Sequence, residues 1–320
     1  FVPDAVPGLD DLNPYARIVA DEALRRGIEV EVLDAEWGEL RLTSGARSIV
    51  TRESLSELTS AIAMSRCDDK RITRRVLERA GLRVPRAFEA TGTDEDRRAL
   101  AELGRVVVKP AKGEQGAGIT VGVDTPEELE AAVERARSTC PNVLIEEMCP
   151  GDDLRIIVID HRVVAAAVRR PAAVVGDGEH SVADLIDAQS RRRAAATGGE
   201  STIPVDETTE QVLARQHLKL GDVPPNGQRV EVRNTANLHT GGTIHDVTGH
   251  LHPALADAAV VASRALDIPV TGLDLIVPDV AGPDYVIIEA NERPGLANHE
   301  PQPTAQAFVD LLFPTLRRDR

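Results

Sequence analysis

Aromatic side chains are scarce in this sequence, which has one Trp, two Tyr and four Phe among 320 residues, or 2%. The core must therefore be built mainly from Val, Leu, Ile and Ala. Long apolar runs are also missing, since no stretch approaches the roughly 20 residues of a membrane-spanning helix. At this length, the chain is long enough for two or three compact units with a sizeable core.

Positive charge is in short supply as well. The chain has 37 Lys and Arg residues against 52 Asp and Glu residues, for a formal net charge of −15. An acidic chain of this kind is poorly suited to hold nucleic acid, or an anionic membrane surface, by general electrostatic attraction. We therefore expect neither nucleic acid nor a membrane as a partner.

Cysteine is the third scarce residue. Cys67, Cys140 and Cys149 lie far apart and have no metal-binding spacing. Three separated cysteines are typical of reduced thiols in a cytosolic protein, and no secretory signal is expected. The sequence therefore predicts a cytoplasmic location.

The stretch that organises the chain is 286–295, where an apolar run reaches Glu289 and Asn291 before a Pro-Gly break. Strand alternation predicts that Glu289 and Asn291 project on the same side as Ile287. An earlier apolar run carries Asp274, and two neighbouring strands would bring the three polar side chains together. Such oxygen ligands suit Mg²⁺ held against phosphate groups. Two ordinary strand ends with solvated acids remain the alternative.

A second feature is the glycine-rich stretch that follows Lys109, which ends the predicted strand 106–110. A glycine-rich loop between two strands can lay backbone N–H groups over phosphates. The spacing is neither a Walker A loop nor a Rossmann fingerprint, and a flexible hairpin is the alternative. Lys109 at the strand end favours phosphate binding.

Several other segments add polar groups. Helices are predicted at 55–66 and 69–80, and the basic face of the second carries Lys70 and Arg74 near the phosphate loop. The strand that begins at Val143 runs into Pro-Gly, where free backbone groups could read an adenine edge and Asp153 could bind a ribose. A plain strand and turn is the alternative. His239, in the polar loop 234–242, is a candidate general base, although a loop histidine more often only makes hydrogen bonds.

Taken together, these pieces resemble the ATP-grasp superfamily. Within it the chain looks closest to the N-acetylglutaminylglutamine synthetases, on stretches 13–17, 53–60, 67–70, 236–242 and 291–303. From about residue 67 it is also similar to the ATP-grasp domain of cyanophycin synthetases. The chain departs from the first family because nothing in it looks like an acetyl-CoA loop.

The resemblance implies an α+β ATP-grasp fold, in which two α/β subdomains clasp ATP. We expect an N-terminal α/β segment at 1–55, a small lid subdomain at 56–145, and a large subdomain with the Mg²⁺ and substrate site at 146–320.

The resemblance also implies roles for individual residues. The expected nucleotide-binding residues are Arg74, Lys109, Gly113, Glu114, Gln115, Gly116, Gly118, Glu146, Glu147, Cys149 and Asp153. The expected ligands of Mg²⁺, with Mn²⁺ as a substitute, are Asp274, Glu289 and Asn291. The transferring phosphate or a substrate carboxylate would be held by Arg155, Arg233 and Asn237.

The implied activity is ADP-forming ligation of a carboxylate to an amine through an acyl phosphate. The expected substrates are ATP and small amino-acid compounds, and the specific expectation is synthesis of the osmoprotectant dipeptide N-acetylglutaminylglutamine. Cyanophycin-like or glutathione-type ligation is the alternative within the same class, and a non-catalytic nucleotide-binding regulatory module is the alternative outside it. A homodimer is the assembly that we consider.

Overall fold

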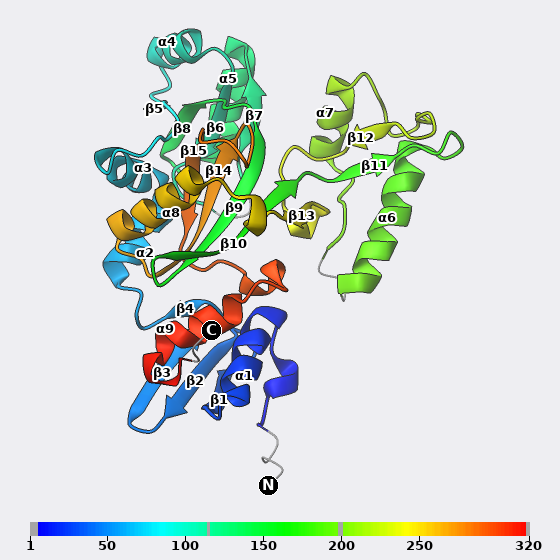
Figure 1. The fold of residues 1–320 in the computed structure, drawn as a ribbon. Coiled ribbons are helices and arrows are strands. Elements are labelled where there is room, and N and C mark those ends of the chain that lie inside the picture. The colour runs from blue at the N-terminus through cyan, green and yellow to red at the C-terminus, as the bar shows by residue number, and fades with distance from the viewer. Residues whose placement is uncertain (1–5, 114–115, 198–200, 318–320) are drawn as a thin grey trace. The chain divides into compact units, whose positions relative to one another are not determined.

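The computed structural model describes residues 6–113, 116–197 and 201–317 (Figure 1). The chain forms two compact units. The first contains the described residues of Phe1–Arg86, Cys149–Ala167 and Asp246–Arg320, and the second contains those of Ala87–Met148 and Val168–His245. The predicted subdomains 1–55, 56–145 and 146–320 are each continuous in the sequence. Each unit of the structure instead combines separate stretches of chain, because strands from distant parts of the chain pair in one sheet.

The first unit begins with a helix packed on an antiparallel sheet. Helix α1 (Pro14–Arg25) starts after Asn13, whose side chain accepts hydrogen bonds from the backbone N–H groups of Tyr15 and Ala16. The strands pair in the order β1-β2-β3-β4. Their bounds are Glu29–Asp34, Glu39–Ser44, Arg47–Arg52 and Leu55–Ser56, and a 3₁₀ turn, η1, covers Leu9–Asp11.

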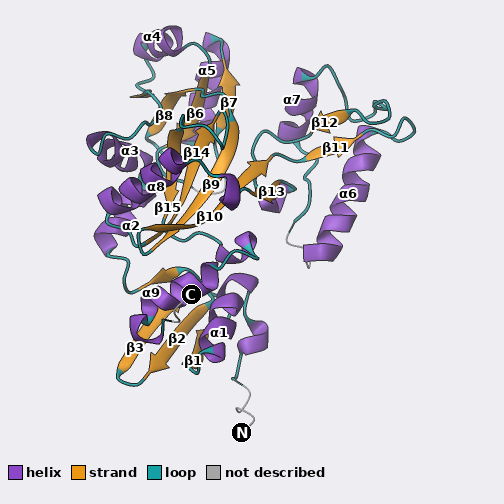
Figure 2. Cartoon of the chain, viewed as in Figure 1, coloured by secondary structure: helices purple, strands orange, loops and turns teal. Residues whose placement is uncertain are grey.

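The main sheet, whose strands β9, β14 and β15 belong wholly to the first unit, has the order β13-β10-β9-β14-β15. These strands are Thr243–Asp246, Arg162–Arg170, Asp152–Ile159, Val270–Val277 and Val286–Asn291. Strand β14 is antiparallel to both of its neighbours, β9 and β15. Figure 2 shows these strands together with helices α2 (Ala61–Asp68), α3 (Lys70–Arg79) and α8 (Pro253–Leu266), of which α3 packs against α8 and β15.

The predicted helix at 55–66 is partly wrong. Leu55 and Ser56 pair with β3 as strand β4, and α2 begins only at Ala61. The side chain of Ser60 caps this helix by accepting a hydrogen bond from the backbone N–H of Ala63. The helix therefore starts six residues beyond the point that apolar spacing indicates, because Leu55 and Ser56 are used in the sheet.

One apolar core joins the N-terminal segment to the main sheet. It includes Val19 of α1, Ile157 and Ile159 of β9, and Phe308 of helix α9 (Thr304–Leu312). Figure 1 shows α9 beside α1, and buried Arg26 links the two helices through Glu22 and Asp310. The 3₁₀ turns η3 (Thr248–His250), η4 (Leu296–His299) and η5 (Pro314–Leu316) complete this unit.

The second unit contains a sheet in the order β5-β8-β6-β7, with strands Ala87–Glu89, Val143–Glu147, Val106–Pro110 and Thr120–Val123. Helices α4 (Asp94–Leu103) and α5 (Pro126–Arg137) cover it through a core that includes Leu100, Leu129 and Ile145. The unit also holds the pair β11 (Ala173–Val175) and β12 (Arg229–Glu231), with helices α6 (Val182–Thr197) and α7 (Glu207–Arg215) and the turn η2 (Leu238–Thr240). The architecture confirms the predicted α+β class.

Among the helices that the structure describes, none combines the length and the apolar character needed to cross a lipid bilayer.

The shared core generates a stability prediction. Phe308 is fully buried, so Phe308→Ala should lower the free energy of unfolding by about 3–5 kcal/mol, through lost burial and the cavity left behind. Phe88, which is 39% exposed, provides the control, and Phe88→Ala should cost less than about 1 kcal/mol. Denaturant unfolding measures both values. Equal losses for the two variants would contradict the role of Phe308.

Candidate active site

A row of charged side chains crosses three strands of the main sheet. Arg155 on β9 lies directly opposite Asp274 on β14, and Asp274 lies directly opposite Glu289 on β15. Residues that face each other across neighbouring strands share one face of the sheet. Ile157 and Ile159 lie on the same face of β9 as Arg155 and belong to the core shared with α1. The charged row therefore borders this core.

Arg155 holds Asp274 with two hydrogen bonds. Its Nε and Nη2 donate to the two carboxylate oxygens, the second at 3.0 Å. Gly272 makes room for this guanidinium, because a Cβ there would lie 2.9 Å from Arg155 Nη1 and 2.9 Å from Pro294 Cβ. A bidentate pair fixes both the direction and the rotamer of the carboxylate. Asp274, which is buried, is therefore held in one orientation.

Glu289 is held from a different element. Lys70, the first residue of α3, places its Nζ 2.9 Å from Glu289 Oε1, and the lysine side chain is only 7% exposed. Sequence reasoning noticed the basic face of this helix but assigned no ligand to Lys70. Arg74, the predicted phosphate ligand, lies one turn further along, with its Nε 3.9 Å from Glu78 Oε1. The position of Lys70 in the sequence could have indicated this contact. Lys70 directly follows the capping residue Asp69, so it lies at the N-terminal end of α3.

Asn291 completes the group. Its Nδ2 donates to the backbone oxygen of Gly272 at 3.2 Å and lies 3.4 Å from Asp274 Oδ2. The predicted placement of Ile287 on this face is wrong. A β-bulge shifts the register between Asp274 and Leu275, so Ile287 lies opposite Leu275, whose side chain points to the other face.

The residues present fit a magnesium ion. Among the described residues, no three His, Cys, Asp or Glu side chains are grouped for metal binding, and the predicted set instead has two carboxylates and one amide. All three side chains offer oxygen, which is the donor that Mg²⁺ prefers. They lie on one face of adjacent strands, with Arg155 and Lys70 balancing the two negative charges.

In the second unit, two predicted nucleotide ligands bind each other. Lys109 Nζ lies 2.6 Å from Glu146 Oε2, and both side chains are buried. Lys109 lies opposite Leu144, two residues before Glu146, so the pair spans β6 and β8 diagonally on one face. Two charges removed from water stabilise each other here, and removing either one would leave the other buried and uncompensated.

The glycine-rich loop joins β6 to β7. Gly113, Gly116 and Gly118 have φ values of 146°, 80° and 72°, in the region that favours glycine. At Gly118 a Cβ would also lie 2.8 Å from Thr139 Oγ1. The predicted ligands Glu114 and Gln115 fall outside the described residues.

The predicted adenine and ribose residues are divided between the two units. Glu147 is the last residue of that strand, and the backbone N–H of Met148 donates to the Arg105 oxygen at 3.1 Å. Cys149 follows in the chain and belongs to the first unit, as does Asp153, which lies opposite Ile276 on β14. Glu147, Cys149 and Asp153 are all half-buried.

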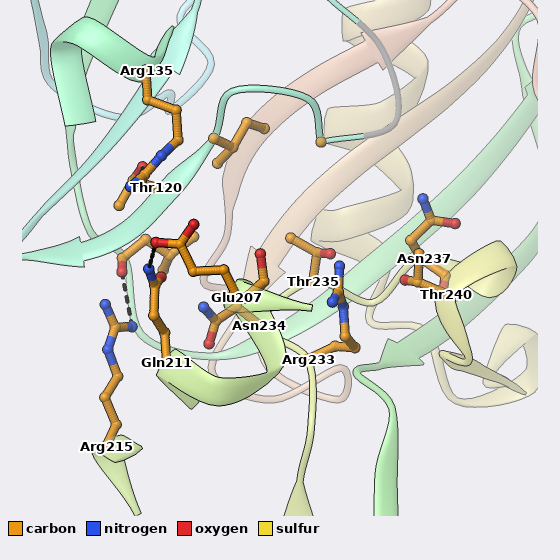
Figure 3. Close-up of a pocket in the computed structure, with 14 residues that line it drawn as sticks. Thr120, Arg135, Glu207, Gln211, Arg215, Arg233, Asn234, Thr235, Asn237 and Thr240 are labelled. Atoms are coloured by element: carbon orange, nitrogen blue, oxygen red, sulfur yellow. Dashed lines mark hydrogen bonds between the residues drawn. The ribbon is translucent and has the colours of Figure 1, made fainter. Parts of the chain in front are cut away.

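A polar cavity of about 150 Å³ lies within the second unit (Figure 3). Its lining comes from the glycine-rich loop and β7, from α5 and α7, and from the stretch 233–240, which includes Arg233 and Asn237. Asn237 Oδ1 accepts a hydrogen bond from the backbone N–H of His239 at 2.9 Å, which orders the start of η2. His239 itself is exposed.

The Arg233 guanidinium is held by hydrogen bonds from its Nη1 atom. Its Nη1 donates to Asp206 Oδ1 at 2.6 Å and to Thr209 Oγ1 at 3.2 Å. Partial burial acts to raise the pKa of Asp206, but the Thr209 backbone N–H and the Arg233 guanidinium hold that pKa below its usual value. Arg233 Nε is buried and has no hydrogen-bond partner among the described residues, so a donor remains for a ligand.

Comparison with known proteins agrees with this geometry. The model of the ATP-grasp domain family matches residues 67–296. Cyanophycin synthetase from Nostoc sp. is 33% identical over 97% of this chain and 36% of its own length. The glutathione biosynthesis bifunctional protein GshAB from Mannheimia succiniciproducens is 30% identical over 92% of this chain and 41% of its own.

A solved structure extends the match to three dimensions. The bifunctional glutathione synthetase from Pasteurella multocida superposes with a TM-score of 0.68 at 28% identity, over 96% of this chain and 44% of that one. The chain thus spans less than half the length of each of these relatives. It belongs to the ATP-grasp family.

The charged row generates a prediction about the metal. Glu289→Gln should replace a charged ligand of the metal by a neutral amide. Turnover should fall about 100-fold or more, because the metal is expected to neutralise charge that develops during phosphoryl transfer. The required Mg²⁺ concentration should rise as well. Asp284→Asn, at an exposed position in the β14–β15 loop, is the matched control. Wild-type turnover and Mg²⁺ dependence in a folded Glu289→Gln variant would refute the assignment.

The buried lysine generates a prediction about the nucleotide. Lys109→Ala should weaken the binding of ATP more than that of adenosine, because only ATP carries the phosphates that the ammonium is expected to bind. Calorimetric titration with both ligands measures the difference, and Lys219→Ala, at an exposed lysine of the same unit, is the control. Equal losses for ATP and adenosine would mean that Lys109 does not contact phosphate.

Proposed function

We propose that this chain uses ATP to join the carboxylate of one amino acid or peptide to the amine of a second. The observation that carries the proposal is the charged row of Arg155, Asp274 and Glu289, within the segment that matches the family. It offers oxygen ligands for Mg²⁺ together with a guanidinium for phosphate or carboxylate. The relatives support an amino-acid or peptide substrate, since one is named for cyanophycin and the other for glutathione.

The proposed reaction has two steps. A carboxylate oxygen of the first substrate attacks the γ-phosphorus of ATP, so that ADP leaves and an acyl phosphate forms. The amine nitrogen of the second substrate then attacks the acyl carbon, phosphate leaves, and the nitrogen loses a proton as the amide bond forms. Little covalent chemistry is left to the protein, whose task is positioning and charge neutralisation.

The proposed roles follow the geometry of each unit. When bound, Mg²⁺ would supply positive charge to the phosphate oxygens, and Asp274, Glu289 and Asn291 would hold it. Lys109 and Arg74 would bind phosphates. Glu147, Cys149 and Asp153 would bind the adenine and ribose. Arg233, through its buried Nε, would donate to the transferring phosphate or to a substrate carboxylate.

Two substrate assignments compete within this class. Cyanophycin-like or glutathione-type ligation has the support of the relatives described above. Formation of N-acetylglutaminylglutamine has the support of the sequence resemblance. That resemblance is most specific in the run 291–303, which begins at the proposed metal ligand Asn291. In this structure that run follows β15 directly and includes η4. It therefore lies next to the reacting groups that we propose.

One experiment separates the assignments. The pure chain is incubated with ATP, Mg²⁺ and pairs of acid and amine, and ADP and product mass are measured together. A cyanophycin-like enzyme should release ADP with a poly-aspartate primer and arginine, and a glutathione-type enzyme with γ-glutamylcysteine and glycine. A dipeptide synthetase should do so with N-acetylglutamine and glutamine, forming one dipeptide per ADP. Glu289→Gln is the inactive control, and no ADP with any pair would contradict ligation.

A further inference from the structure

The cavity of the second unit has a face that the proposed roles leave unused. Glu207, Gln211 and Arg215 are spaced four residues apart on α7, so they form one stripe along that helix, and all three line the cavity (Figure 3). We call these residues the α7 stripe. Gln211 Nε2 donates to Glu207 Oε1 at 2.9 Å, which ties the first two members together.

Two arginines of this cavity donate hydrogen bonds to uncharged groups. Arg215 Nη1 donates to the Val121 backbone oxygen at 3.1 Å, and Arg135 Nη1 donates to Thr120 Oγ1 at 3.0 Å. Both partners are neutral. A guanidinium has five N–H donors, so each arginine keeps capacity for a carboxylate after these bonds. Within a chain of net charge −15, the cavity is a local concentration of positive charge.

The cavity also has one negative group. Among its described lining residues, Glu207 alone carries a carboxylate, and it begins the α7 stripe whose far end is Arg215. A stripe with an acid at one end and a guanidinium at the other matches an α-amino acid, which carries an ammonium and a carboxylate. An N-acylated acid substrate has no ammonium, and neither has ATP, so neither offers a charged partner for Glu207.

We propose that the α7 stripe, together with Arg135, binds the amine substrate as a free α-amino acid. Arg215 and Arg135 bind its carboxylate, and Glu207 and Gln211 bind its amino group until that group is deprotonated and attacks. The cavity is also lined by Arg233 and Asn237, which places the amine beside the residues proposed for the activated acid. This inference rests on the proposed ligation and adds the residues that bind the second substrate.

The test uses Arg215→Gln and Glu207→Gln in the full chain, with the acid and amine pair that the wild-type chain accepts. Loss of one charge-assisted hydrogen bond should raise the KM for the amine about 10- to 100-fold in each variant. The KM values for ATP and for the acid should not change. Trapping of the acyl phosphate by hydroxylamine, without amine, should proceed at the wild-type rate, because the first step does not use the α7 stripe.

Two controls sharpen the result. Arg97→Gln removes an exposed arginine of α4 in the same unit, paired with Glu130 outside the cavity, and should leave all KM values unchanged. The α-carboxamide of the amine substrate lacks the charged carboxylate. It should be a poor substrate for the wild-type chain, and Arg215→Gln should reduce the difference between the acid and the carboxamide forms.

Several outcomes would overturn the inference. An unchanged KM for the amine in both variants would show that the α7 stripe does not bind it. A raised KM for the acid alone, or for ATP alone, would assign the cavity to that ligand. Glu207 bonds to Gln211 on its own helix, whereas Arg215 bonds to Val121 of β7, so the Glu207 variant tests binding even if Arg215→Gln disturbs the contact with Val121. Failure of hydroxylamine trapping in the wild-type chain would refute the ligation proposal, and this inference with it.

Discussion

The structure of the first unit depends on two ion pairs, Lys70 with Glu289 and Arg155 with Asp274, whose carboxylates lie opposite each other on β15 and β14. Buried carboxylates are costly without partners, and here each acid is matched by one cation from a different element. This pairing of charges depends on the register of β9, β14 and β15, and on the position of the first residue of α3. It also depends on a glycine at 272, which leaves room for the Arg155 guanidinium. Removing one member would leave the charge of its partner uncompensated, so the row constrains the fold as much as the chemistry.

The second unit uses the same solution on a smaller scale. Lys109 and Glu146 neutralise each other on neighbouring strands, beside a loop whose glycines adopt positive φ values. In both units, side chains with predicted ligand roles are already oriented by ion pairs. A side chain that is already oriented loses less conformational entropy when it binds a ligand. This arrangement reconciles a set of buried charges with a stable fold.

Sequence reasoning predicted the fold class and brought Asp274, Glu289 and Asn291 to one face, because strand alternation is local and strong. It failed where pairing between strands decides. The bulge that moves Ile287 to the other face comes from the register against β14, and nothing in 286–291 alone indicates it. The contact of Lys70 with Glu289 likewise depends on how α3 packs on β15. The α7 stripe has the spacing of any solvated helix face, so only the cavity singles it out.

The geometry separates two kinds of recognition. The α7 stripe offers charges that fit groups shared by all α-amino acids, so it selects the class of the amine and not its side chain. A separate set of contacts lies in the first unit. There Glu53 accepts hydrogen bonds from Asn13 Nδ2 at 3.0 Å and from Arg293 Nη1 at 2.8 Å. Ser54 adds a buried bond to the Pro294 oxygen at 2.7 Å. These bonds fasten the N-terminal segment to the stretch that follows Asn291, the last residue of β15.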